Sequence, residues 1–166
     1  MSRNYRFTIS STDSIYKAKH SIQIKSTDLL HQMNSVLRLQ PGHTEEISLI
    51  DGSGEVFYSK LESISKTSAE FKILKIEKSE RELNTEITFF VPIIKAENFT
   101  WMLRKLTEIG VQNFVPLICE RSQKSNIQAL SSSKARERLT KIIEEATEQC
   151  EGVVFARLHE AIELTN

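Results

Sequence analysis

The sequence predicts two small domains, a β-rich domain followed by an α/β domain with a parallel sheet. Up to residue 76, short segments of alternating apolar and polar residues are interrupted by one helical pattern. Residues 87–166 instead alternate strand patterns with helix patterns. Residues 77–86 form a charged and polar run without apolar periodicity, which is typical of a linker. The predicted boundaries are therefore 1–76, 77–86 and 87–166.

The first domain is predicted to be a small β-barrel. Residues 5–10, 20–26 and 68–77 have strand patterns, and residues 51–54, Asp-Gly-Ser-Gly, form a hairpin signal between two β-rich arms. Several short strands with one helix in about 75 residues favour a barrel-like architecture.

One helix is predicted inside this domain. Ser26 or Thr27 can cap its start, and Pro41-Gly42 stops it. Its apolar stripe at helical spacing consists of Leu29, Leu30, Met33, Val36 and Leu37.

The second domain is predicted to follow a β-α-β-α-β order. Apolar runs at 87–95 and 113–119 are typical of buried strands, and Gly110 stands where the helix between them should end. That helix has the stripe Phe99, Met102, Leu103, Leu106 and Ile109.

A second helix is predicted after the serines at 131–133, which can cap it, and Gly152 ends it. A third strand is expected at 153–158, and residues 159–164 are expected to begin another helix. Right-handed crossovers would make such a sheet parallel.

Composition excludes several classes of protein. Net charge is zero, with 22 basic and 22 acidic residues, so the chain lacks the overall basic field of a non-specific nucleic-acid binder. Two distant cysteines suggest neither a zinc site nor a disulfide framework. The sequence contains no signal peptide or membrane-span pattern, no glycine-rich phosphate loop and no HExxH or GxSxG motif. We expect a cytoplasmic protein without a metal.

Candidate site residues follow the second strand of the α/β domain. In open parallel sheets, ligands collect at the carboxyl ends of the strands, where Glu120, Arg121, Ser122 and Lys124 are expected. The guanidinium of Arg121 could hold a phosphate or a polarised base carbonyl, although a solvated surface arginine is equally compatible with the pattern.

Other charged residues have alternative explanations. Lys105 and Glu108 have ordinary helical salt-bridge spacing, and Glu148 with Gln149 is a weak signal at the end of a helix. Arg3 and Arg6 flank aromatic residues in a pattern that suits RNA, but an ordinary half-buried strand gives the same alternation.

Three ordered blocks of sequence resemble the ribosomal RNA small subunit methyltransferase E family. They are "HQMNSVLRLQPGHTEEISLIDGSGEVF", "KAENFTWMLRKLTEIGVQNFVPLICERS" and "LTKIIEEATEQC". The resemblance implies an N-terminal PUA-like RNA-binding barrel followed by an α/β SPOUT domain. Members of the family methylate N3 of a uridine in small-subunit (16S) ribosomal RNA with S-adenosylmethionine, and they form homodimers.

The resemblance also implies which part of the fold these 166 residues supply. The segments that form the knot and bind the cofactor follow the third strand and its helix in the family. The chain is therefore expected to contain the RNA-binding barrel and the first half of the SPOUT domain, to hold no cofactor-binding residue, and to be inactive alone. The alternative is a catalytically silent RNA-binding protein or a truncated fragment.

The family motifs match this sequence residue by residue. "VLR" corresponds to Val36, Leu37 and Arg38, and "KxxExGV" to Lys105, Glu108, Gly110 and Val111. The "ER" and "EQ" pairs are Glu120-Arg121 and Glu148-Gln149. The sequence departs from the family after "EQ", where an arginine is usual and Glu151, Gly152 and Val153 stand, and in the next strand, where Ala156 and Arg157 replace the usual proline.

These matches lead to a hypothesis for the site. Arg121 would stabilise the charge that develops on the uracil oxygens, and Glu108 or Glu148 would orient the base or accept its proton. Lys105, Glu120 and Gln149 would support the site. RNA phosphates, on small-subunit RNA or the 30S subunit, would contact Arg3, Arg6, Arg38 and Lys124.

Overall fold

The computed structural model describes residues 5–9, 14–16, 20–42, 46–79 and 82–164. The chain divides into two compact units, Met1–Glu80 and Arg81–Asn166, and the division lies inside the predicted linker. The strand before the division continues to Lys78, two residues into that linker.

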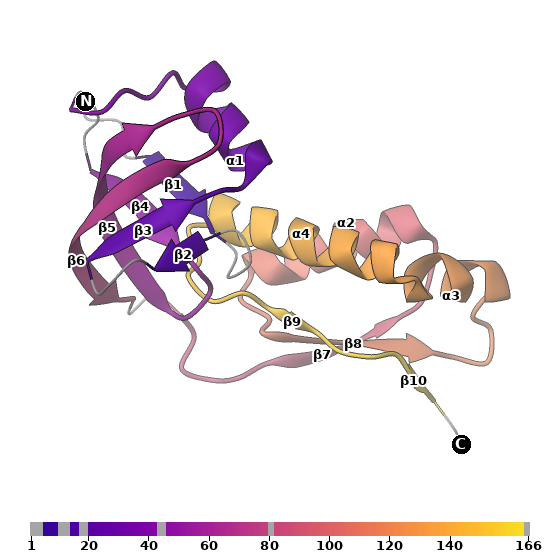
Figure 1. The fold of residues 1–166 in the computed structure, drawn as a ribbon. Helices are drawn as coiled ribbons and strands as arrows, with labels where there is room; N and C mark the ends of the chain where they lie inside the picture. The colour runs from indigo at the N-terminus through magenta and orange to yellow at the C-terminus, as the bar shows by residue number, and fades with distance from the viewer. Residues whose placement is uncertain (1–4, 10–13, 17–19, 43–45, 80–81, 165–166) are drawn as a thin grey trace. The chain divides into compact units, whose positions relative to one another are not determined.

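The first unit is built on a six-stranded sheet in the order β1-β4-β5-β6-β3-β2 (Figure 1). The pair β1–β4 is parallel and the other pairs are antiparallel. The hairpin at residues 51–54 is confirmed, and the left-handed backbone of Gly52 and Gly54 suits its turn. The strands are β1 (Tyr5–Thr8), β2 (Ser14–Tyr16), β3 (Ser21–Ile24), β4 (Ile47–Ile50), β5 (Glu55–Ile64) and β6 (Ala69–Lys78).

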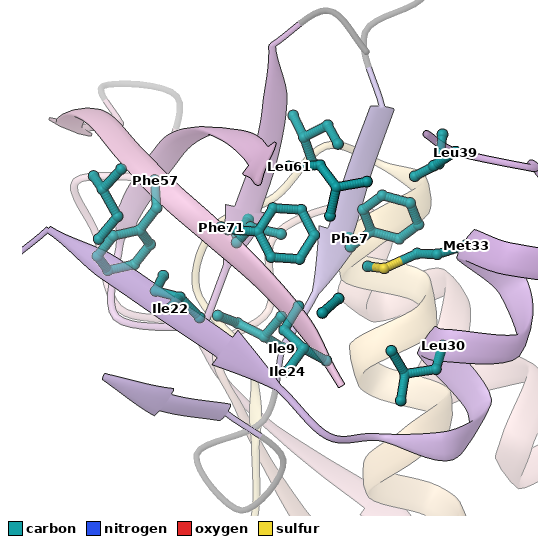
Figure 2. Packing of buried hydrophobic residues seen from close by; sticks show 14 residues of the cluster. Phe7, Ile9, Ile22, Ile24, Leu30, Met33, Leu39, Phe57, Leu61 and Phe71 are labelled. Atoms are coloured by element: carbon teal, nitrogen blue, oxygen red, sulfur yellow. The ribbon is translucent and has the colours of Figure 1, made fainter. Parts of the chain in front are cut away.

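Large apolar side chains fill the concave side of this sheet. Figure 2 shows Phe7 and Phe71 beside Leu61, with Met33 and Leu30 reaching the same cluster from the helical segment. Phe71 and Met33 are fully buried. The predicted apolar stripe therefore packs as expected, except that Val36 is 66% exposed.

The helical segment of the first unit is irregular. It begins as α1 (Thr27–His31) and continues as a π-helical turn, η1 (Gln32–Val36). The predicted stop at Pro41-Gly42 is therefore several residues late. The amide of Leu39 donates to the carbonyl of Met33 (2.9 Å), and Arg38 between them has a left-handed backbone with φ of 53°.

The second unit contains a parallel sheet whose central strand is β8 (Asn113–Ile118). Strand β7 (Thr88–Pro92) pairs with one side of β8, and β9 (Arg157–Leu158) and β10 (Ile162–Glu163) pair with the other. The predicted parallel β-α-β-α-β order is confirmed.

The helices α2 (Ala96–Glu108) and α4 (Ser133–Gln149) lie beside each other on one face of this sheet (Figure 1). The hydroxyl of Ser132 accepts a hydrogen bond from the amide of Ala135 (3.2 Å), as the predicted cap requires. Gly110 has φ of 90°, which confirms the predicted helix end. After α4, the left-handed residue is Glu151 (φ 59°), one residue before the glycine expected to end the helix.

The structure departs from the predictions for this unit in three places. A short helix, α3 (Lys124–Ser131), precedes α4 and was not predicted. Residues 159–164 do not begin a helix, because Ile162 and Glu163 pair with Leu117 and Ile118. Of the strand predicted at 153–158, only the last two residues form β9.

Proline explains why the last strand is interrupted. The amides of Arg157, His159 and Leu164 donate to the carbonyls of Gln112, Phe114 and Ile118, so even-numbered residues of β8 present their backbone groups to this side. Pro116 belongs to that series but has no amide hydrogen to donate. The last strand consequently splits into β9 and β10 opposite this proline.

Candidate functional site

A short turn follows the carboxyl end of β8 and presents Glu120 and Arg121. The amide of Ser122 donates to the carbonyl of Cys119 (2.9 Å), and the amide of Cys119 donates to the hydroxyl of Ser122 (3.0 Å). The same hydroxyl donates to the carbonyl of Ile93 just after β7 (3.4 Å). Ser122 therefore fixes the turn to the neighbouring strand, while the side chains of Glu120 and Arg121 are exposed.

Two helices begin at this same end of the sheet. Lys95 is the N-cap of α2 and Gln123 is the N-cap of α3, and neither side chain accepts a capping hydrogen bond. The first residue of α3 is Lys124, which is exposed. Helix N-termini favour anions, so the amides add to the charges of Lys95, Arg121 and Lys124. This end of the sheet suits a negatively charged ligand.

The structure places Glu108, Glu148 and Gln149 at the opposite end of the sheet. Glu108 is the last residue of α2, and Glu148 and Gln149 are the last two residues of α4. Each helix runs back from the carboxyl ends of the strands to their amino ends. Both carboxylate oxygens of Glu108 lie 2.9 Å from the Nζ of Lys105, which confirms the ion pair. A cavity of about 200 Å³ is lined by Glu108, Cys150 and Glu151 among others.

One copy of the chain does not bring these predicted site residues together. The six residues of β8 lie between the two ends, so Arg121 is roughly 20 Å from Glu108 and Glu148, given a rise of about 3.3 Å per strand residue. One nucleotide base cannot contact both ends within one copy of the chain. Lys105 and Gln149 accompany the glutamates, whereas Glu120 stays beside Arg121.

The RNA-binding candidates of the first unit lie on two elements. Arg6 is in β1 with Ser48 as its cross-strand partner, and it is partly buried. Arg38 is exposed at the left-handed end of η1. Arg3 lies outside the described residues.

Sequence reasoning missed a hydrogen-bonded chain across the second unit. The amide nitrogen of Asn113 donates to the carboxylate of Glu86 (2.8 Å), and the Nε2 of His159 lies 2.9 Å from the Oδ1 of Asn113. Since that oxygen can only accept, the Nε2 of His159 carries the proton. Asn113 is only 6% exposed. The sequence shows no signal for this network, because it depends on the register of β9 with β8.

A second missed residue is Arg136 of α4. Its guanidinium donates to the carbonyls of Leu158 (2.9 Å) and His159 (3.2 Å), and it pairs with Glu160 (3.1 Å). Arg136 therefore holds the segment that interrupts the last strand.

Within the described ranges, no group of three or more His, Cys, Asp or Glu side chains is arranged to hold a metal ion. None of the helices in those ranges is long and apolar enough to cross a membrane.

Comparison with known proteins identifies the second unit. A family model described as RNA methyltransferase domain matches residues 81–166. The chain belongs to this RNA methyltransferase family. The match begins at the first residue of the second unit and includes the turn with Glu120 and Arg121.

Curated relatives confirm that the chain resembles the ribosomal RNA small subunit methyltransferase E family, as the three sequence blocks indicate. The chain is 31% identical over 126 residues to ribosomal RNA small subunit methyltransferase E of Synechocystis, covering 76% of this chain and 39% of the relative. It is 30% identical over 142 residues to ribosomal RNA small subunit methyltransferase E 2 of Borreliella burgdorferi, covering 86% of this chain and 57% of the relative. The chain thus spans about half the length of these relatives.

Solved structures share the fold. Ribosomal RNA small subunit methyltransferase E from Neisseria gonorrhoeae bound to S-adenosyl methionine superposes with a TM-score of 0.79 at 24% identity, covering 97% of this chain and 63% of that one. A probable rRNA-methyltransferase from Porphyromonas gingivalis gives a TM-score of 0.75 at 27% identity, covering 94% and 60%.

Proposed function

We propose that this chain acts in the S-adenosylmethionine-dependent methylation of uridine N3 in small-subunit ribosomal RNA, in the cytoplasm. The family match over residues 81–166 carries the proposal, and the cationic strand end with Arg121 supports it. In this proposal the first unit is a PUA-like RNA-binding domain and the second is the first half of a SPOUT domain that dimerises when complete.

Arg121 is the proposed catalytic residue of this chain. Methylation at N3 requires loss of the imide proton, which leaves negative charge on the uracil oxygens. A guanidinium fixed near those oxygens stabilises that charge in the transition state. The two hydrogen bonds of Ser122 hold the backbone of the turn, so little reorganisation is needed to place Arg121.

The roles of Glu108 and Glu148 follow from their position. In the proposal they would reach a base near Arg121 only if a second copy of the chain supplied them, because one copy separates the two ends by the length of β8. Lys105 and Gln149 would support them there.

Two cavities lined by described residues of the second unit are small. The cavity at the amino end of the sheet is about 200 Å³, and a second cavity lined by Arg136 and Glu160 is about 60 Å³. Sites for molecules of the size of S-adenosylmethionine have volumes of roughly 300–1,000 Å³.

The test mixes the purified chain with small-subunit ribosomal RNA and S-adenosylmethionine carrying a labelled methyl group. Transfer to RNA supports the proposal, and Arg121→Ala should then slow transfer by about 100-fold or more. Arg104→Ala on α2 removes the same charge away from the strand ends and should retain activity.

The second candidate is a catalytically silent RNA-binding protein or fragment. It is favoured because the chain covers only 39% and 57% of the two relatives' lengths. It predicts salt-dependent RNA binding without methyl transfer and without heat of S-adenosylmethionine binding in calorimetry. In that case alanine substitution of Arg6, Arg38 and Lys124 together should weaken RNA binding. Absence of both RNA binding and transfer would contradict both candidates.

A further inference from the structure

The long hairpin of β5 and β6 in the first unit places two like charges opposite each other (Figure 1). Residues directly opposite in an antiparallel pair have Cβ atoms about 5 Å apart, so their charges interact. Near the open end of the hairpin, Glu55 stands opposite Lys78, a pair of opposite charges. Further along, Lys60 stands directly opposite Lys72. Lys60 and Lys72, named the lysine pair, repel each other and by themselves destabilise the hairpin.

The packing of the first unit fixes the lysine pair on the outer face of the sheet. The next cross-strand pair, Leu61 and Phe71, is buried in the core. Side chains alternate between the two faces of a strand, so Lys60 and Lys72 point away from this core, and both are exposed. A one-residue change of register would separate the two lysines only by turning Phe71 out of the core. The repulsion is therefore built into the fold.

The surrounding carboxylates do not neutralise the lysine pair. Glu70 lies two residues from Lys72 on β6, but its two oxygens are 3.4 Å from the Nε2 of Gln23 and 3.5 Å from the Oγ of Ser63. Neither Lys60 nor Lys72 forms an ion pair with any residue that the structure describes. The two ammonium groups are thus available to an anion from outside the chain.

The other lysines at the open end of the same hairpin have acidic neighbours. The Nζ of Lys75 donates to the carboxylate of Glu77 (3.1 Å) and lies 4.2 Å from the centre of the Tyr58 ring. Lys78 stands opposite Glu55. Positive charge without an adjacent carboxylate partner is therefore concentrated at the lysine pair rather than spread along β6.

We propose that the lysine pair binds the phosphate backbone of the RNA substrate. A phosphate between the two ammonium groups replaces their mutual repulsion by two attractions, and lysine on its flexible stem binds phosphate as a point charge. Such contacts position an RNA without reading its sequence. This surface deepens the proposed function, on which it rests, and it lies on strands other than those that carry Arg6 and Arg38.

The test measures binding of the full chain to small-subunit ribosomal RNA over a range of salt concentrations. Lys60→Ala combined with Lys72→Ala should reduce the salt slope by about two, one for each lost phosphate contact, and should weaken binding on the order of tenfold at low salt. Lys75→Ala combined with Lys78→Ala is the matched control. It removes two positive charges from the same hairpin, but both have acidic neighbours, so the slope should change by less than about one.

A charge reversal separates loss of binding from loss of folding. Lys60→Glu places a carboxylate opposite Lys72 and converts repulsion into attraction. The urea midpoint of unfolding should therefore rise while the affinity for RNA falls. A damaged fold would lower both quantities, and a lower midpoint for this variant would contradict the repulsion on which the lysine pair is argued.

Three further results would overturn the RNA surface. One is a salt slope that falls equally in the Lys60/Lys72 variant and in the control; methyl transfer by the same chain would then still support the proposed function. Another is a wild-type chain that binds no RNA. The third is capture by phosphatidylserine vesicles that the Lys60/Lys72 variant loses while its RNA slope is unchanged, because the lysine pair would then face a membrane.

Discussion

The two units of this chain differ in how their sheets are enclosed. In the first unit, the six-stranded sheet and the helical segment surround a cluster in which Phe71 and Met33 are fully buried. In the second unit, helices cover one face, and Phe90 on the other face is 53% exposed. The strand phenylalanines Phe71 and Phe90 are thus expected to contribute very differently to stability.

The largest expected difference in stability is between replacing a buried phenylalanine and replacing an exposed one. Phe71→Ala should lower the free energy of unfolding by about 3–5 kcal/mol, because it removes a fully buried ring and leaves a cavity. Phe90→Ala should cost less than about 1 kcal/mol, because water already reaches that ring. Urea unfolding followed by circular dichroism measures both.

Asn113→Ala should produce the next largest effect. The substitution removes the amide that joins Glu86 to His159 and should cost about 1–3 kcal/mol. The same change at Asn98, exposed on α2, should be nearly neutral. Fluorescence of Trp101, the single tryptophan, follows the second unit during unfolding. Equal losses for the two variants would show that the network contributes no stability.

The two left-handed residues offer a matched pair, one in each unit. Arg38→Gly and Glu151→Gly should each raise stability by about 0.5–1 kcal/mol, because glycine adopts positive φ without the steric cost of a side chain. If Arg38 contacts RNA, its replacement should also reduce the salt dependence of RNA binding by about one phosphate contact, whereas Glu151→Gly should leave it unchanged. Identical salt slopes for both variants would remove Arg38 from the RNA surface.

The smallest expected effect concerns Lys75 of the first unit. The hydrogen bond that Lys75 donates to Glu77 raises the pKa of Lys75 above its usual 10.5. Because the folded pKa is the higher one, the stabilising contribution is present below the unfolded pKa and is lost as pH rises through the folded value. NMR titration of the Lys75 side chain should give a lower pKa in Glu77→Gln than in the wild type.

Much of the fold could be predicted because local signals agree with tertiary packing. The stripe around Leu103 and the position of Gly110 specify α2, and the glycines at 52 and 54 specify the hairpin. Helix α3 was missed because its eight residues bury only Leu130. Residues 159–164 were misassigned because hydrogen bonds to β8, made far away in sequence, decide their conformation.

The candidate site could be predicted only in part. A turn at the carboxyl end of β8 follows from the strand order, so the exposure of Arg121 agrees with expectation. The distance between Arg121 and Glu108 could not be predicted from their motifs, because a crossover helix returns its last residues to the amino ends of the strands. The hydrogen bond between Asn113 and His159 depends on the register between β8 and β9, which the sequence does not encode locally.

Pro116 has a consequence for how the second unit opens. Because it divides the last strand into two short ladders, β10 can detach from β8 without breaking the hydrogen bonds of β9. Hydrogen exchange at Leu164 should then be governed by a local opening, whereas exchange at Arg157 should require a larger one. The proline thus makes the end of this sheet a separate cooperative element, one that can be released, or gain a new neighbour, while the rest of the unit stays folded.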